Sequence, residues 1–556
     1  MLYQRLACIL VILSLAAPAT PVVASMSHVY ISQVAKGGNT GRDCANALGS
    51  TFFNTAGNWG SGASQIGPGT TVHICGTWTG EAGAQFLRFQ KGGLPGSVIT
   101  LLFEPGAVMQ APYFAFGSSG SPSGAIDINS RSHLLIDGGT TCGIENRVVI
   151  ELNRCNGIIR NTDNGTNLTY QADSVGVYSS GSPSDIEIRN LVISVYARID
   201  SHNNAHAPDG VKTYGIYFDH SGPTKLLVHH NNVQHAARGI MLNFEGRNAS
   251  NIQFYNNYVA DIGWGLTIGG YGANTFATSV KIFNNEVTDW DNWVSPSGAF
   301  HSNGIFTFHN CPNGEICFVG SADSYIYNNY IHGDLNGNFS GASASGFIQA
   351  SSASQFTIFN NHIVGSVTAG SFGIGNGIYL LGCATKSPTF CGGGIRIYNN
   401  TIDFSGANGN CISVATLTAN TIRNNIMANG CNGLVNSYQA GFSLMDSNYN
   451  VGHLLRGNHW ACDMTNPCKT LADIQFYGID LSSTDRDPLL VANGQLRAGS
   501  AAIGSGVNLT NLGIAELNKD ANGAPRPSTG PWEIGAFEFI SAGDLAPPPP
   551  INLRIQ

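Results

Sequence analysis

Charged side chains are scarce in this chain of 556 residues, because Asp, Glu, Lys and Arg together make up only 11% of it. The formal net charge of -8 lacks the basic excess of nucleic-acid-binding proteins, so the sequence gives no reason to expect that partner. After residue 24 the chain also lacks an apolar run long enough to span a bilayer. Glycine is abundant, with 70 residues, and hydrophobic residues make up 42%. This composition argues against disorder and favours many short strands joined by turns.

The first 24 residues have the organisation of a secretory signal. Arg5 supplies a positive start, residues 7–18 form an apolar core too short for a bilayer, and residues 22–24 offer small side chains for cleavage. A membrane anchor is the alternative interpretation of this segment. We expect a mature chain that begins near Ser25, has no membrane span, and is secreted or held at the cell surface.

Twelve cysteines remain once Cys8 is removed with the signal. An even number in an exported chain favours disulfides over the alternative, metal ligation. No two neighbouring cysteines have the two-residue spacing of a zinc knuckle. Pairing neighbours along the chain predicts the bridges Cys44–Cys75, Cys142–Cys155, Cys311–Cys317, Cys383–Cys391, Cys411–Cys431 and Cys462–Cys468.

An Asn-Asn pair recurs along the middle of the chain, at 231–232, 256–257, 284–285, 328–329, 360–361, 399–400 and 424–425. Phe or Ile lies two residues before the pair in six of the seven cases, and Val or Ile lies one or two residues after it in all seven. Short strands that begin with glycine alternate with these pairs, at Gly215, Gly239, Gly265, Gly304, Gly346, Gly377 and Gly433. A strand that ends in a fixed Asn corner, repeated every few dozen residues, is the signature of a stacked solenoid. Asn tolerates the left-handed backbone of a sharp corner, and stacked Asn side chains can hydrogen-bond from coil to coil.

This rhythm of Asn-Asn and Gly-Ile resembles the right-handed parallel β-helix superfamily, the pectate-lyase-like fold, over residues 124–450. The resemblance implies an all-β solenoid. We expect a signal at 1–24, an N-terminal cap and first coil at 25–110, the β-helix at 111–460, an end region at 461–540 and a Pro-rich tail at 541–556.

The end region carries three short motifs in order, at 499–506, 520–527 and 534–538. It is similar to the choice-of-anchor Q type of secreted bacterial β-helix proteins, which implies a segment that closes the helix. Asp520, Arg526 and Glu538 are interpreted as a structural salt-bridge or turn network.

Two sets of polar residues share offsets from the coil glycines and predict a column on the outside of the helix. Lys212, His235, Asp261 and His301 stand three to four residues before a glycine, and Tyr214, Arg238, Trp264 and Asn303 stand one before. Aromatic rings stack on sugars, and Arg and Lys suit uronate carboxylates. We expect Arg238 or His235 to act as base, Lys212 to neutralise a carboxylate, and Trp264 to serve as platform. Tyr214, His301, Asn303 and His309 would line the groove, and a solvated polar edge is the alternative.

A second column follows the strands and includes Asp219, His220, Asn243 and Glu245. Asp219 and Asp261 are the candidate ligands for Ca2+, which binds several oxygens, although the sequence has no dense run of Asp.

Two functions remain open from the sequence. The first is a secreted, monomeric β-helix that binds an extracellular acidic polysaccharide and cleaves it by β-elimination, with glycoside hydrolysis less supported. The second is a non-catalytic cell-surface or matrix scaffold, an adhesin-like β-helix. The ordered column favours the first, and the lack of a complete lyase or hydrolase motif favours the second.

Overall fold

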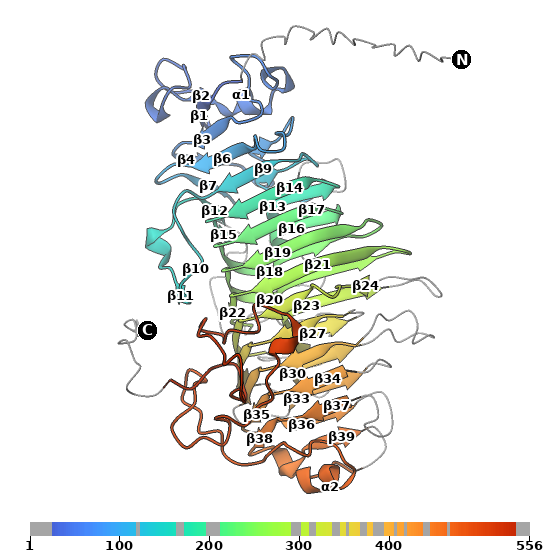
Figure 1. The fold of residues 1–556 in the computed structure, drawn as a ribbon. Coiled ribbons are helices and arrows are strands. Elements are labelled where there is room, and N and C mark those ends of the chain that lie inside the picture. The colour runs from blue at the N-terminus through green and yellow to red at the C-terminus, as the bar shows by residue number, and fades with distance from the viewer. Residues whose placement is uncertain are drawn as a thin grey trace, which may run out of the picture.

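The structure is a computed structural model that describes residues 25–117, 123–162, 172–195, 212–290, 302–310, 318–335, 345–351, 355–366, 375–381, 394–404, 409–415, 420–436, 445–463 and 467–540. The chain folds as a right-handed parallel β-helix, in which successive coils stack along one axis (Figure 1). No helix among the described residues is long and apolar enough to cross a membrane.

Two long parallel sheets form the walls of the solenoid. The first sheet contains β1 (His28–Ser32), β2 (Leu48–Gly49), β3 (Thr71–Ile74), β6 (Ile99–Phe103), β9 (Leu134–Asp137), β14 (Ser184–Arg189), β17 (Thr224–His229), β19 (Ala249–Tyr255), β21 (Phe276–Phe283), β24 (Phe318–Val319), β25 (Tyr325–Tyr327), β28 (Thr357–Phe359), β31 (Arg396–Tyr398), β34 (Asn420–Arg423) and β37 (Met445–Asn448).

The second sheet contains β4 (Thr77–Thr79), β5 (Leu87–Arg88), β7 (Val108–Ala111), β8 (Ile126–Asp127), β12 (Ile158–Asn161), β13 (Ser174–Gly181), β15 (Val192–Ser194), β16 (Thr213–Ser221), β18 (Asn232–Asn243), β20 (Tyr258–Tyr271), β22 (Glu286–Thr288), β23 (Asn303–Asn310), β26 (Tyr330–Asp334), β27 (Ser345–Ser351), β29 (His362–Ser366), β30 (Gly375–Leu381), β32 (Thr401–Phe404), β33 (Gly409–Ala415), β35 (Ile426–Ala428), β36 (Asn432–Asn436), β38 (Val451–His453) and β39 (Ala461–Asp463). Parallel pairing already begins at β1 and β3, so coils reach back into the segment expected to be a cap. The remaining elements are the hairpin β10 (Ile144–Glu145) and β11 (Val148–Val149) and the short helices α1 (Ser50–Asn54) and α2 (Leu471–Phe476).

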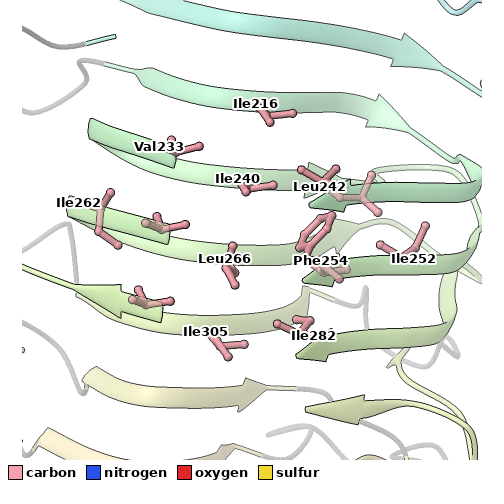
Figure 2. Close-up of a cluster of buried hydrophobic side chains, with 14 of the residues drawn as sticks. Ile216, Val233, Ile240, Leu242, Ile252, Phe254, Ile262, Leu266, Ile282 and Ile305 are labelled. Carbon is pink, nitrogen blue, oxygen red and sulfur yellow. The ribbon is translucent and has the colours of Figure 1, made fainter. Parts of the chain in front are cut away.

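The interior of each coil is filled by aliphatic side chains at matching positions. Ile240, Leu266 and Ile305 pair along the axis, and each is at most 1% exposed (Figure 2). The glycine before each of them is required, because a Cβ on Gly239 would lie 2.6 Å from Cγ1 of Val259 and 2.7 Å from the carbonyl oxygen of Gly265. Gly346 departs from the expected register. It pairs with Asn303, one position before the glycine column.

Asparagines form a continuous hydrogen-bonded ladder at the corner between the two sheets. Its members are Asn231, Asn257, Asn285, Asn329, Asn361, Asn400, Asn425 and Asn450. In each step the amide of one coil donates to Oδ1 of the next, at 2.9–3.1 Å. The expected ladder is therefore confirmed, with one shift. In the 231–232 pair the ladder residue is the first asparagine, because His230 takes the left-handed corner with φ 54°.

The C-terminal region packs along the outside of the later coils rather than only on their end. Leu517 and Trp532 lie against Tyr327, Phe359 and Tyr398, which project outward from the first sheet. Asn360, Asn399 and Asn424, the other residues of three Asn pairs, donate to carbonyl oxygens of Lys519, Glu533 and Val507. This region therefore clamps the coils from outside.

A buried ion pair fixes this clamp. Arg526 is fully buried, forms an ion pair with Glu538, and donates to Oδ1 of Asn360 at 2.9 Å. Asp520 accepts from the backbone N–H groups of Asn522, Ala524 and Glu538 at 2.8–2.9 Å. Burial is the largest cause that raises the pKa of Glu538, and Arg526 acts in the opposite direction. Asp520, Arg526 and Glu538 of the end-region motifs thus have a structural role.

Four of the predicted disulfides are present: Cys44–Cys75, Cys142–Cys155, Cys411–Cys431 and Cys462–Cys468. Cys311, Cys317, Cys383 and Cys391 lie outside the described residues, as do the signal segment and the Pro-rich tail.

Candidate functional site

Four of the predicted residues lie in one row on the outer face of the second sheet. Tyr214 pairs with Arg238, Arg238 with Trp264, and Trp264 with Asn303, on β16, β18, β20 and β23. We call this row the outer column. The register predicted from the glycines therefore holds across these four coils, although the functional roles assigned to the residues stay predictions.

Arg238 is held between two aromatic rings of the outer column. Its guanidinium carbon lies 5.1 Å from the ring centre of Tyr214 and 4.5 Å from that of Trp264, within the range of a cation–π contact. Nη1 also donates to the hydroxyl of Tyr214 at 3.1 Å. These contacts fix a half-buried guanidinium in one orientation, which reduces the entropy lost when it binds an anion.

The same row changes character in later coils, where it becomes a second amide ladder. Asn376, Asn410 and Asn432 pair in register. The side-chain amide of Asn410 donates to Oδ1 of Asn376 at 3.1 Å, and that of Asn432 donates to Oδ1 of Asn410 at 3.0 Å. His459 closes this ladder, with Nδ1 3.1 Å from Oδ1 of Asn432. After Asn303 this row therefore holds Gly346 in one coil and Asn in the next three, whereas three successive earlier coils place Tyr214, Arg238 and Trp264 there.

The role expected for Trp264 as an open sugar platform does not fit its position. One face of the ring lies against Arg238, and Phe306 packs edge-on at 5.2 Å. Parallel coils stack at about 4.8 Å, so rings in one column cover each other's faces and present their edges outward. Trp264 holds the guanidinium instead.

His235 and Asp261 face each other at the corner that precedes the outer column. Nε2 of His235 lies 3.3 Å from Oδ2 of Asp261, and Nδ1 lies 3.1 Å from the hydroxyl of Ser194. Both residues have left-handed backbone, with φ 53° in each. The imidazole is 35% exposed and its carboxylate partner 15%, so solvent and ligands reach this pair. A strained, partly exposed His–Asp pair is an arrangement that enzymes use for proton transfer.

Lys212 and His301 do not join that pair. Counting back from the Tyr214–Arg238 pair places Lys212 level with Ala236, one residue past the corner, where it is exposed. His301 lies outside the described residues.

Two residues expected to line the groove are buried. Asn303 is fully buried and donates to Oε1 of Gln349 at 2.9 Å. His309 is 3% exposed, with Nε2 2.7 Å from the hydroxyl of Thr275. Burial lowers the pKa of His309 to about 4. Their burial argues against direct contact with a ligand, and His309 instead keeps a neutral imidazole inside the fold.

The second predicted column forms a separate acidic cluster at the far end of the same strands. Oδ1 of Asp219 accepts from the hydroxyl of Tyr217 at 2.7 Å and lies 2.8 Å from Nδ1 of His220. Nε2 of His220 lies 3.2 Å from Oε2 of Glu245. Burial raises the pKa of Tyr217 well above its ordinary value.

Asp219 and Asp261, the two candidate calcium ligands, lie at opposite ends of their strands and cannot share one ion. Asp261 belongs to the corner with His235, whereas Asp219 belongs to the cluster with Tyr217. In the described part of the chain, the one group of three close metal-ligand side chains is His459, Cys462 and Cys468, whose cysteines form a disulfide. Calcium dependence therefore stays a prediction without a converging ligand set.

Sequence reasoning did not find Asp127, a buried carboxyl in the same row as Tyr178 and Tyr217. Burial raises the pKa of Asp127 to about 6, whereas the backbone N–H of Asn129 and the guanidinium of Arg88 act to lower it. Asp127 lies before Gly215, the first of the coil glycines, so no glycine register linked it to the later coils. The signal in the sequence that could have found Asp127 is the pair Ile126-Asp127, in which a carboxyl follows directly on a buried strand residue.

Comparison with models of protein families finds no match, and comparison with curated proteins finds none. Among solved structures, a pectate lyase Pel9A is 14% identical with a TM-score of 0.39, over 93% of this chain and 98% of that one. The GH136 lacto-N-biosidase from Eubacterium ramulus is 12% identical with a TM-score of 0.40, over 79% and 66%. The A-module of the mannuronan C-5 epimerase AlgE6 of Azotobacter vinelandii is 11% identical with a TM-score of 0.31, over 71% and 91%. Likenesses of this size say nothing about what this chain binds.

Proposed function

We propose that this protein is a secreted β-helix that binds an acidic polysaccharide of the extracellular space along the outer face of β16, β18 and β20. The observation that carries the proposal is the outer column. Where later coils repeat Asn, three coils place Tyr214, Arg238 and Trp264, and the two rings orient the guanidinium. A departure from the local rule of the repeat marks a site that stability alone does not require.

The chemistry that fits the face is recognition of a uronate carboxylate by Arg238. A guanidinium offers parallel N–H donors that match the two oxygens of a carboxylate, and partial burial strengthens such charge-assisted hydrogen bonds. Exposed Lys212 would add a second positive charge near the corner. Export is supported by the four disulfides, which persist in oxidising compartments.

Cleavage by β-elimination is the reaction that the corner pair supports. His235 would take the proton α to the bound carboxylate, the freed electron pair would form the carbon–carbon double bond, and the glycosidic oxygen would leave and take a proton from water. Asp261 would orient the imidazole and stabilise the imidazolium. Arg238 would neutralise the charge that develops on the carboxylate in the transition state.

The second candidate is a non-catalytic scaffold that binds the polymer without cleaving it. The burial of Asn303 and of the Tyr214 and Tyr217 rings favours this candidate, because these groups rigidify the face without contacting a ligand. Binding by Arg238 is common to both candidates, and turnover separates them.

The test compares Arg238→Asn, which installs the residue of the later coils, with Arg247→Asn, a control at an arginine that bonds only the hydroxyl of Ser182 in the described part. Binding to polygalacturonate, alginate and a glycosaminoglycan is measured by calorimetry, and cleavage by the ultraviolet absorbance of the unsaturated product. We expect Arg238→Asn to weaken binding by about 10- to 100-fold, the value of a charge-assisted hydrogen bond. We expect His235→Asn to keep binding and abolish cleavage. Equal binding by Arg238→Asn and wild type would refute the proposal, and binding without any product would select the scaffold.

A further inference from the structure

The C-terminal end of the solenoid carries the two most exposed aromatic side chains in the described part of the chain. Phe476 is 85% exposed and Tyr477 is 66% exposed, next to each other where α2 ends (Figure 1). Leu481, four residues after Tyr477 in the sequence, is 62% exposed. Exposed aromatic rings of this size need an explanation, since they cost solvation in the free protein.

The short helix that carries the exposed rings is anchored to the end of the solenoid. Ile474, on the opposite side of α2, is 1% exposed and belongs to the main core, so the helix closes the end of the solenoid. A capping box between Thr470 and Asp473 fixes the start of α2. Gly478, with φ 81°, terminates it, and Nε2 of Gln475 donates to the carbonyl oxygens of Asp480 and Ser483 at 3.0 and 3.2 Å.

The two rings make a corner rather than a flat surface. Their centres are 5.6 Å apart and their planes stand at 84°. In the outer column the aromatic faces are covered by neighbouring coils, whereas here no coil follows. Exposed aromatic rings bind the C–H faces of sugars, and Asp473 and Ser482, which lie within a few residues of the rings in the sequence, are exposed for sugar hydroxyls.

Two other occupants fit the patch less well. A stable interface with a second copy needs about 800 Å² per partner, and two rings of roughly 150–250 Å² each with one leucine fall short of it. An anionic membrane surface is disfavoured by the neighbouring carboxylates of Asp473 and Asp485 and by the net charge of -8.

We propose that Phe476 and Tyr477 form a second polysaccharide-binding site, a platform on the end cap that stacks on sugar rings irrespective of their charge. It rests on the proposed function only for the identity of the natural polymer. The platform would anchor the protein to a matrix while the outer column engages a uronate chain.

The experiment measures depletion of the full-length protein by insoluble cellulose, chitin, xylan and calcium pectate particles. We expect Phe476→Ala/Tyr477→Ala to bind at least one of these about tenfold more weakly than wild type, and Leu481→Ala and Tyr477→Phe to bind as wild type. All three changes lie at exposed positions, so thermal unfolding should stay close to wild type.

Each outcome decides the proposal. Equal depletion of wild type and the double variant on every particle overturns it, as does failure of wild type to bind any particle. Loss of binding in Arg238→Asn alone leaves the proposed function standing and removes the platform. Loss in the double variant alone supports the platform, and if this holds on the calcium pectate particles as well, it removes the role of Arg238. Sedimentation that shows a wild-type dimer and a monomeric double variant would assign the patch to a second copy instead.

Discussion

The two asparagines of each corner have different roles, and substitution of one pair separates them. Asn329 is the ladder residue of its coil and is fully buried. Its Oδ1 accepts from the backbone and side-chain amides of Asn285 at 3.1 and 3.0 Å, and its Nδ2 donates to the carbonyl of Ile282 and to Oδ1 of Asn361, each at 2.9 Å. Asn328, beside it, has φ 55° and a side-chain oxygen that accepts no hydrogen bond among the described residues.

Asn329→Ala removes four hydrogen bonds and leaves two backbone groups without partners. The N–H of Asn285 loses its acceptor, and the carbonyl of Ile282 loses its donor, whereas Oδ1 of Asn361 keeps the backbone N–H of Asn329. A buried polar group left unsatisfied costs about 1–3 kcal/mol, so the free energy of unfolding should fall by about 4 kcal/mol. Asn328→Gly, which keeps the left-handed backbone available, should change it by less than about 0.5 kcal/mol.

The assay is unfolding in guanidinium chloride followed by tryptophan fluorescence, combined with hydrogen exchange of the amides in neighbouring coils. A solenoid unfolds in segments, so exchange should accelerate first in β21, β25 and β28, which flank the substituted corner. An unchanged midpoint for Asn329→Ala, or a larger effect for Asn328→Gly, would refute the division of roles.

Two further predictions concern stability. Arg526→Met should lower the free energy of unfolding by about 3–5 kcal/mol, because it leaves the carboxylate of Glu538 buried without its partner. The double variant Arg526→Met/Glu538→Leu should recover much of that loss in the same unfolding assay. Equal unfolding midpoints for the single and double variants would contradict this prediction. His362 is 3% exposed, and burial lowers its pKa to about 3, so the folded state stays neutral while the unfolded chain binds a proton below about pH 6.5. The contribution of His362 to stability is complete above pH 6.5 and is lost as the pH falls toward the pKa that His362 has in the folded state. His362→Gln should therefore reduce the loss of unfolding free energy between pH 6.5 and 4.5 by about 1.4 kcal/mol per pH unit, and identical pH slopes for the two proteins would contradict the assignment.

The corner residues show why the sequence predicts this fold so well. A ladder asparagine must satisfy buried backbone groups in every coil, and the residue before it must adopt positive φ, so both requirements leave a mark at each repeat. The ladder nevertheless extends beyond the visible pairs. It includes Asn450, which follows Tyr449 with φ 56°, because tyrosine can adopt the left-handed backbone when the surrounding coil fixes it. A search for Asn-Asn alone misses such a coil.

The candidate site is only half visible in the sequence, and the reason is side-chain environment rather than register. The glycines place Arg238 between Tyr214 and Trp264 correctly. They give no information on which ring faces are covered, so Trp264 was expected to be open. His309 has a polar side chain at a plausible offset, yet it lies inside the fold beside Phe244 at a ring separation of 5.2 Å. The offset of a residue from its coil glycine determines which residues are its neighbours along the axis. Whether its side chain is buried depends on segments from elsewhere in the chain.

The strongest argument that the outer column is functional comes from the coils that lack it. Asn376, Asn410 and Asn432 show that an amide at this position bonds to the next coil and extends the ladder. Tyr, Arg and Trp in the same position form no such continuous ladder, and Arg238 adds the cost of a partly desolvated charge. A repeat gains little stability from this exchange, since the neighbouring coils solve the same packing problem with asparagine. The His235–Asp261 pair lies at the adjoining corner of the same coils, where left-handed backbone recurs at Asp289 and Gly333 and so belongs to the repeat itself. A costly departure from the repeat, with a partly exposed His–Asp pair beside it in the same coils, is what a binding site built on a rigid solenoid requires.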